Sequence, residues 1–274
     1  MSALDFLLPW DSQPQEVAEL NAGIFPSAEL AFNAGVGPVN LVSGAIGTVS
    51  GSPTYGVGIG GRSLNVAAAS TGGIYWPVRS RSVADPWTVI VNIRIDGSTA
   101  ATQGFLQIAS TTANSGSPYL LLARNNTDFR VFAGGNYRVT DAAALIQGTE
   151  HVIAVTYDGA TMTVVRNGVV VGTYSSANLG SNTSTHAWVG NGFNGSVGSG
   201  TYGAWYSSAA MSVAVLQEIT RGNHWQLFAP QSIWVPVSAA AAPSGTFIPL
   251  VGRGPGMALA GPGGLAGNSY GASA

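Results

Sequence analysis

Three histidines and twelve carboxylates are the side chains of this sequence that could carry out acid–base or metal chemistry. His151, His186 and His224 are far apart, and none has the His-x-x-His or Glu-x-x-His spacing of metal-binding motifs. Glycoside hydrolysis needs two carboxylates placed together, whereas these are scattered, mostly at turn positions where Asp caps backbone N–H groups. We therefore expect no catalytic residue, no metal ion and no cofactor, and a glycan hydrolase is the weakest of the functional interpretations.

A glycine-rich stretch at residues 56–61 matches the G-x-G-x-x-G pattern of dinucleotide-binding proteins. That fingerprint binds a pyrophosphate only where it follows a strand and opens a helix. Here it runs into residues 62–66, whose alternating pattern predicts a strand. We interpret the glycines as a loop that leads into a sheet.

Aromatic side chains in segments rich in Gly, Asn and Ser could stack on sugar rings, with Asn and Asp supplying hydrogen bonds. They could equally be core or subunit-interface residues. The rings in this set are Tyr119, Phe132, Tyr137, Trp188, Phe193, Tyr202, Trp205 and Tyr206. The candidate glycan or interface aromatics among them are Tyr119, Tyr137, Phe193, Tyr202 and Trp205.

The segment 150–171, EHVIAVTYDGATMTVVRNGVVV, has the clearest strand pattern in the chain. β-Branched residues alternate with period two on either side of Asp158-Gly159, and Asn167-Gly168 then turns the chain again. Asp-Gly and Asn-Gly between such runs are the strongest short-range signals for β-hairpins. The segment is thus predicted to form three antiparallel strands.

Short strands are predicted along most of the chain. Candidates lie at residues 30–32, 63–66, 73–76, 86–95, 104–109, 119–123, 129–133, 137–139, 187–189, 203–206 and 212–216. Turn signals separate them at intervals typical of a sandwich or barrel.

Both ends of the chain differ in composition from this β region. We predict an N-terminal arm at residues 1–27, a sandwich domain at 28–237 and a Gly/Ala-rich C-terminal arm at 238–274. The C-terminal arm has too little side-chain mass to fold alone, so it is either disordered or ordered along a neighbouring subunit. Its candidate anchors are Phe247, Ile248, Leu250, Met257 and Leu259.

The composition favours a protein that assembles with neighbours. Only 8% of residues are charged, all ten basic residues are Arg, and the net charge is −2, whereas globular domains have about 25% charged residues. A chain with so little charge has weak repulsion to keep it dispersed. The slightly negative net charge argues against nucleic-acid binding, which needs a basic surface. No stretch is apolar enough for a membrane span. The N-terminus lacks the basic region of a signal peptide.

The order of these signals resembles the laminin-G-like, concanavalin A-like jelly roll over about residues 28–220. The resemblance rests on segments 61–66, 87–94, 104–108, 119–122, 150–159 and 166–168, of which HVIAVTYDG with the later RNG is the most specific. It implies an all-β fold of two antiparallel sheets with about six or seven strands each. Some relatives bind calcium beside an acidic pair in the penultimate strand. Residues 202–211 carry no carboxylate, so we expect no such site.

Both ends of the domain resemble proteins of tailed bacteriophages. The resemblance lies in Pro14-Gln15-Glu16 and in residues 225–236, WQLFAPQSIWVP. It implies a non-enzymatic virion protein, such as a decoration, fibre or spike component of head or tail, that contacts other virion proteins and itself as a homo-oligomer such as a trimer. The alternative is a carbohydrate-binding or adhesion module for host surface glycans.

Overall fold

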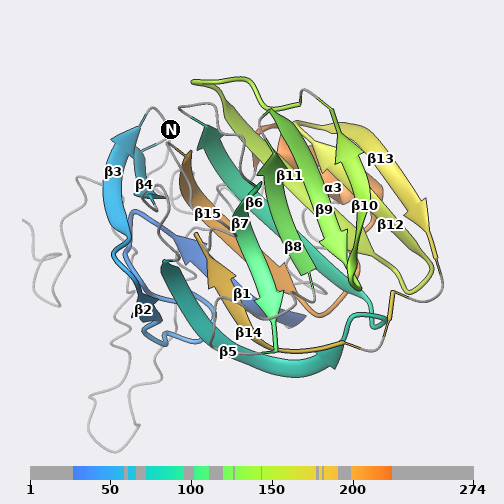
Figure 1. Cartoon of the computed structure of the whole chain (residues 1–274), viewed down its shortest axis with the longest axis horizontal. Helices are drawn as coiled ribbons and strands as arrows, with labels where there is room; N and C mark the ends of the chain where they lie inside the picture. Colours follow the sequence, from blue (N-terminus) through green and yellow to red (C-terminus); the bar gives the residue numbers. More distant parts are fainter. Residues whose placement is uncertain are drawn as a thin grey trace, which may run out of the picture. The chain divides into compact units, whose positions relative to one another are not determined.

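The computed structural model describes residues 27–58, 61–65, 72–95, 102–110, 120–125, 127–142, 144–176, 179–180, 182–190 and 199–223. These residues form two antiparallel sheets that pack face to face (Figure 1). The all-β sandwich predicted from the sequence is therefore confirmed. Residues 1–26 of the predicted N-terminal arm, the predicted C-terminal arm and its anchors lie outside the described residues, as does the predicted domain boundary at residue 237.

One sheet has eight strands in the order β13-β12-β11-β6-β15-β4-β3, and β1 also pairs with β15. Its strands are β1 (Ala28–Asn33), β3 (Thr54–Gly58), β4 (Gly61–Asn65), β6 (Trp87–Ile95), β11 (Glu150–Tyr157), β12 (Thr161–Arg166), β13 (Val169–Ser175) and β15 (Ser199–Ser207). β6 lies at the centre of this sheet and pairs with β11 on one side and β15 on the other.

The other sheet has seven strands in the order β10-β9-β8-β7-β14-β5-β2. They are β2 (Thr48–Ser50), β5 (Gly73–Ser82), β7 (Thr102–Ala109), β8 (Leu120–Asn125), β9 (Asp128–Ala133), β10 (Asn136–Asp141) and β14 (Thr183–Val189). The resemblance implied about six or seven strands in each sheet, so the first sheet is slightly larger than expected.

The main core lies between the sheets because alternate residues of each strand point inward. Val91 and Ile153 of the eight-stranded sheet and Trp76, Leu122 and Val131 of the seven-stranded sheet belong to one buried cluster. Successive side chains point to opposite faces, so the neighbours of these residues form the outer faces.

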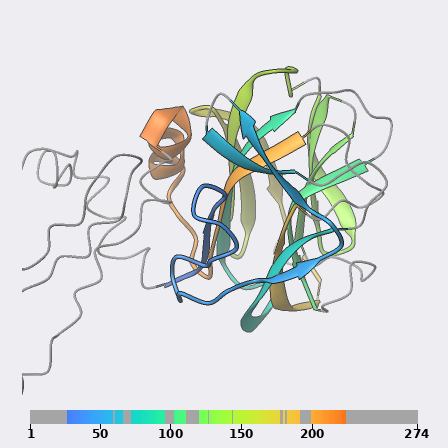
Figure 2. The same ribbon diagram turned by 90° about the vertical axis from the view of Figure 1, so that its left-hand side faces the viewer.

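The outer face of the eight-stranded sheet has a second apolar layer. The short helix α3 (Val213–Glu218) and the turn η3 (Ile219–Asn223) lie outside the sandwich (Figure 2). Val215, Leu216 and Ile219 pack there with Ile90 and Trp205 of the sheet. This second layer explains why β6 is buried on both faces and reads as an almost continuous apolar run.

The strand predicted at residues 212–216 is wrong, since this segment begins helix α3. Ser212 caps the helix: its extended backbone precedes the first turn, and its Oγ accepts the N–H of Val215 at 3.4 Å. The apolar residues of the segment pack on Trp205 and Ile90. A run of five residues cannot distinguish a buried strand from a short buried helix by periodicity.

Two threonine hydroxyls fix the chain just before this helix. Thr88 Oγ1 and Thr156 Oγ1 lie 3.0 Å apart on neighbouring strands, and the Met211 N–H donates to them at 2.9 and 3.2 Å. The two threonine hydroxyls and the Met211 N–H are thereby paired, as burial requires.

The three strands predicted within residues 150–171 are confirmed as β11, β12 and β13. The Asp158 carboxylate accepts the N–H groups of Ala160 and Thr161 at 2.8 and 2.7 Å, and these two hydrogen bonds lower the Asp158 pKa. Asn167 and Gly168 both have positive φ, 50° and 83°, as a two-residue type I′ turn requires.

His151, the buried histidine of β11, has a lowered pKa, chiefly because burial disfavours the charged imidazole. The Ile146 N–H donates to its Nε2 at 3.0 Å, whereas the Ile146 carbonyl, 3.4 Å from the same nitrogen, can accept from the charged ring and raises this pKa. Arg166 lowers this pKa and Asp141 raises it, and these two residues form an ion pair at 2.8 Å.

We expect His151 to make the folded state less stable as the pH falls below 6.5, the ordinary histidine pKa. Below that pH the unfolded chain binds a proton that the folded chain does not, so the free energy of unfolding decreases with decreasing pH. Urea unfolding at pH 7 and pH 5 measures this change, and in His151→Gln it should be smaller. An equal decrease in both proteins would show that His151 does not cause it.

Candidate aromatic binding face

A row of directly paired residues crosses all seven strands of the smaller sheet. From β10 to β2 the row, here called the cross-strand row, is Tyr137, Phe132, Leu121, Gln107, Trp188, Tyr75 and Thr48. Directly opposite residues in antiparallel strands share one face of a sheet. Their sequence neighbours, such as Leu122, Val131 and Trp76, enter the core, so the cross-strand row lies on the outer face.

The accessible rings of the cross-strand row lie toward its two ends. Tyr137 is 45% exposed, and Phe132 and Tyr75 are half-buried. In the middle, Leu121, Gln107 and Trp188 are at most 2% exposed. A ligand on this face would therefore meet an aromatic group near either end, separated by a buried middle section.

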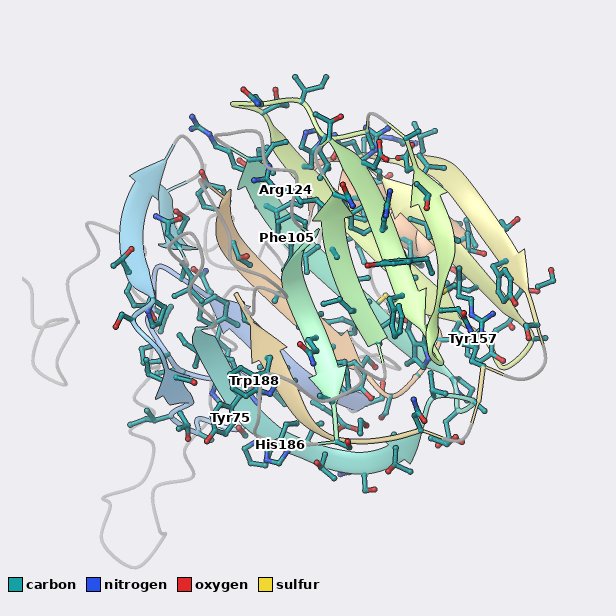
Figure 3. The ribbon with its side chains drawn as sticks, in the orientation of Figure 1. Tyr75, Phe105, Arg124, Tyr157, His186 and Trp188 are labelled. Carbon is teal, nitrogen blue, oxygen red and sulfur yellow. The ribbon has the colours of Figure 1, made fainter. Side chains whose placement is uncertain are left out.

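At one end, three rings gather where β5 and β14 run side by side (Figure 3). The rings of Tyr75 and Trp188 have centroids 4.4 Å apart, and His186 meets the edge of Tyr75 at 5.7 Å. The Thr185 hydroxyl lies 2.9 Å from His186 Nδ1 and donates to the Ser110 carbonyl at 2.9 Å. The buried Trp188 thus supports a half-buried Tyr75 with a polar ring beside it.

At the other end, the β9–β10 hairpin presents a second ring group. Tyr137 and Phe132 meet edge to face with centroids 5.5 Å apart. The Arg130 guanidinium lies 5.4 Å from the centre of the Tyr137 ring and forms an ion pair with Asp128 at 3.6 Å. An exposed ring flanked by a guanidinium offers both a stacking surface and hydrogen-bond donors.

Of the candidate glycan or interface aromatics that the structure describes, Tyr137 alone lies on an accessible surface. Tyr137 lies in the cross-strand row, as described. Trp205 is fully buried beneath helix α3, and Tyr202 is 6% exposed. These two rings cannot stack on a ligand in this conformation, because the residues around β15 cover them. Tyr119 and Phe193 lie outside the described residues.

The sequence reasoning did not select Tyr75 or His186. Tyr75 alternates with Ile74 and Trp76, which are fully buried core residues, so its outward direction could have been read from the pattern of period two. For His186 the sequence favours a hydrogen-bonded or surface histidine over a metal ligand or general base. Its position beside Tyr75 depends on the pairing of β5 with β14, about 110 residues apart in sequence.

The described carboxylates and histidines do not form a metal site, since no three of them lie close enough to hold an ion. His224 lies outside the described residues. The G-x-G-x-x-G glycines fall on the β3–β4 hairpin, whose second strand begins at Gly61. No helix in the described part of the chain is long and apolar enough to cross a membrane.

Two sheets of this topology define a jelly-roll sandwich of the lectin type. The profile of the concanavalin A-like lectin/glucanases superfamily matches residues 68–211, more than half of the chain, and the chain belongs to that superfamily. Comparison with curated protein sequences gives no match.

Solved structures with this fold include both binding domains and enzymes. The binding domain of botulinum neurotoxin DC, in complex with rat synaptotagmin II, aligns with a TM-score of 0.55 at 13% identity, over 72% of this chain and 52% of that one. Domain 4 of AbnA, a GH43 extracellular arabinanase from Geobacillus stearothermophilus, in complex with arabinotriose, aligns with 0.53 at 14%, over 71% and 98%.

A sialidase from Trypanosoma rangeli aligns with a TM-score of 0.54 at 10% identity, over 73% of this chain. This chain spans only 33% of the length of that sialidase. At such identities the similarity establishes the fold alone.

Proposed function

We propose that this chain is a non-catalytic recognition module that binds a saccharide on the outer face of its seven-stranded sheet. The observation that carries the proposal is the cross-strand row, with accessible rings near both ends. Rigid aromatic side chains provide a large contact area at a low entropic cost, and their neighbours Arg130 and His186 can hydrogen-bond to hydroxyls. The opposite outer face is partly covered by α3.

The partners of the described carboxylates support a non-catalytic role. Asp141 and Glu29 each pair with an arginine, Asp158 caps a turn, and Glu150 accepts a hydrogen bond from Asn92 at 2.6 Å. Asp128 and Glu218 also pair with arginines, and Asp85 accepts the Ser82 N–H. Each of these groups has a structural role, whereas a glycosidase needs two carboxylates that face one substrate.

The similar structures are consistent with recognition by this fold. The arabinanase domain is solved with arabinotriose and the neurotoxin domain with a synaptotagmin. A sandwich of this type can therefore bind either a saccharide or a protein partner. For this chain the rings of the cross-strand row favour the saccharide.

A glycan array probed with the full-length chain tests this proposal, with bacterial surface saccharides among the glycans. We expect binding, and for the best glycan we expect the affinity to fall about ten-fold, ~1.4 kcal/mol, in both Tyr75→Ala and Tyr137→Ala. Val169→Ala, at a 61% exposed site on β13, is the matched control and should bind normally. Binding that neither tyrosine variant weakens would refute this location.

The same glycans test the non-catalytic role. Incubation of each bound glycan with the full-length chain, followed by mass spectrometry, should leave the glycan intact. Release of a shorter saccharide would make the chain a hydrolase and overturn that part of the proposal.

The second candidate is a structural protein of a phage virion, and exposed apolar residues favour it. Val36, Val42, Ile46 and Val49 lie within one segment and are 48%, 44%, 79% and 52% exposed. With 8% charged residues in the chain, such a segment suits contact with a neighbouring subunit. A displayed virion protein could also carry the recognition face, so the two candidates are compatible.

Self-association of the full-length chain tests the second candidate. Sedimentation analysis should show a homo-oligomer that Ile46→Ser weakens. Ile146→Ser removes an equally apolar side chain, 62% exposed, from another loop and should leave the oligomer intact. A monomer at all concentrations, or equal effects of both variants, would argue against this segment as a subunit contact.

A further inference from the structure

A pocket of about 390 Å³ opens where the later half of β5 passes the start of β1. Its lining includes Glu29 of β1 and Ser27, the residue just before that strand. Val78 and Arg79 line it from β5. No residue of the cross-strand row lines the pocket. Pro77, another lining residue, pairs with His186 beside Tyr75, so the pocket adjoins that ring group. Its volume is within the usual range for small-ligand sites.

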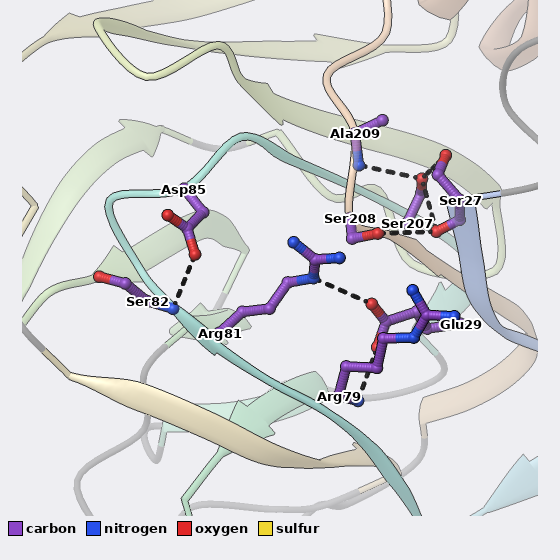
Figure 4. Close-up of polar contacts among 9 residues, drawn as sticks. All are labelled: Ser27, Glu29, Arg79, Arg81, Ser82, Asp85, Ser207, Ser208 and Ala209. Atoms are coloured by element: carbon purple, nitrogen blue, oxygen red, sulfur yellow. Dashed lines mark hydrogen bonds and ion pairs between the residues drawn. The ribbon is translucent and has the colours of Figure 1, made fainter.

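Among the described lining residues, the one carboxylate already has hydrogen-bond partners. Glu29 is nearly buried, with 7% of its side chain exposed. Its Oε2 accepts the backbone N–H of Arg79 at 2.8 Å, and its Oε1 accepts Nε–H of Arg81 at 3.2 Å (Figure 4). A buried carboxylate needs such partners, so Glu29 serves to fix β5 against β1.

The Arg79 guanidinium is the remaining charged group of the pocket. Among the described residues no carboxylate pairs with it, since Glu29 pairs with Arg81 and the Asp85 carboxylate accepts the Ser82 N–H at 3.0 Å. The side chain is exposed and extends from a strand whose backbone position Glu29 fixes. A guanidinium binds a carboxylate through two parallel hydrogen bonds, and so prefers it to a neutral hydroxyl.

The other walls of the pocket suit a sugar ring. Val42 and Val78 provide apolar surface, and Ser27 and Ser43 provide hydroxyl groups. The Ser27 hydroxyl lies 2.8 Å from Ser207 Oγ, which holds it in place (Figure 4). A pyranose has apolar faces and a polar rim, which matches this combination.

We propose that this pocket binds a sugar that carries a carboxylate, with the carboxylate on Arg79 and the ring against Val42 and Val78. Hexuronates and nonulosonates share this chemistry. Because Pro77 of the pocket pairs with His186, a saccharide with both neutral and acidic units could contact the pocket and the ring group at Tyr75 together.

Titration calorimetry on the full-length chain tests the pocket, with glucuronate and N-acetylneuraminate as probes, and glucose and inorganic phosphate for comparison. We expect at least one acidic sugar to bind with a dissociation constant of about 1 mM, and glucose and phosphate to bind at least ten-fold more weakly. Arg79→Gln should weaken the acidic sugar about ten-fold, because it removes the guanidinium but keeps the backbone N–H that Glu29 accepts.

Further variants test whether the acidic sugar binds in the pocket and not elsewhere on the chain. Ser43→Trp changes an exposed lining residue and should block the pocket even if Arg79→Gln folds poorly. Arg221→Gln, at a 65% exposed arginine elsewhere, should bind normally. Acidic-sugar binding that Tyr137→Ala weakens and Arg79→Gln does not would place the site on the cross-strand row and overturn the pocket, whereas the glycan-array result does not bear on the pocket.

The proposal is overturned if neither acidic sugar binds. It is also overturned if glucose or phosphate binds as tightly as the acidic sugars. Equal affinities of wild type, Arg79→Gln and Ser43→Trp for the acidic sugar would likewise place its binding elsewhere.

Discussion

Replacing Trp205 with alanine should destabilise the folded chain by about 3–5 kcal/mol, the usual cost of removing a large buried aromatic ring. Trp205 is fully buried and belongs to the cluster that joins the eight-stranded sheet to Met211, Val215 and Leu216. Its loss would leave a cavity under helix α3, which the rigid sheet could only partly fill. Urea unfolding followed by circular dichroism measures the change.

Trp205→Phe is the matched control for this prediction. The indole Nε1 has no acceptor among the described residues, so Trp205→Phe removes buried volume but no hydrogen bond. It should therefore lower the free energy of unfolding clearly less than Trp205→Ala. A loss below about 0.5 kcal/mol for Trp205→Ala, the range of surface substitutions, would mean that helix α3 does not bury Trp205 in solution.

Gly134→Ala should destabilise the chain by at least about 3 kcal/mol, through two separate effects. Gly134 has a φ of +56° in the β9–β10 turn, a region that costs other residues about 1–2 kcal/mol. In addition, a Cβ at this position would collide with the carbonyl oxygen of Leu179, a backbone atom that cannot rotate away. The same hairpin presents Tyr137, so glycan binding should weaken as well.

The neighbouring Gly135→Ala separates the two effects. Gly135 also has a positive φ, +87°, but nothing lies within 4 Å of a Cβ added there. We expect it to cost only the conformational term of about 1–2 kcal/mol. Chemical unfolding of both variants gives the comparison, and equal losses would show that the Leu179 contact is absent in solution.

The parts of the fold that depend on residues adjacent in the sequence, such as tight turns, could be predicted from the sequence. Asn167-Gly168 forms the two-residue turn that its residue types favour, and Asp158-Gly159 marks the turn between β11 and β12, where Gly159 has a positive φ. Residues 212–216 could not be assigned, because their helical state depends on the Ser212 cap and on packing against Trp205. A short apolar segment fits either state until its partner surface is known.

The candidate binding face was only partly predictable for a similar reason. Tyr137 lies in a turn-flanked strand, so its exposure followed from local pattern. Trp205 has a similar local sequence, rich in Gly, Tyr and Ala, yet α3 covers it. The pairing of Tyr75 with Trp188 depends on strand register between distant segments, which composition and spacing do not specify.

The most direct test of the recognition face is two-dimensional NMR of the isotopically labelled full-length chain, titrated with the best saccharide from the glycan array. We predict that the shifted amide signals cluster around Tyr75, Phe132, Tyr137 and His186 on the outer face of the seven-stranded sheet. Shifts confined to β13 or to helix α3, or the absence of any saccharide that binds, would contradict this account.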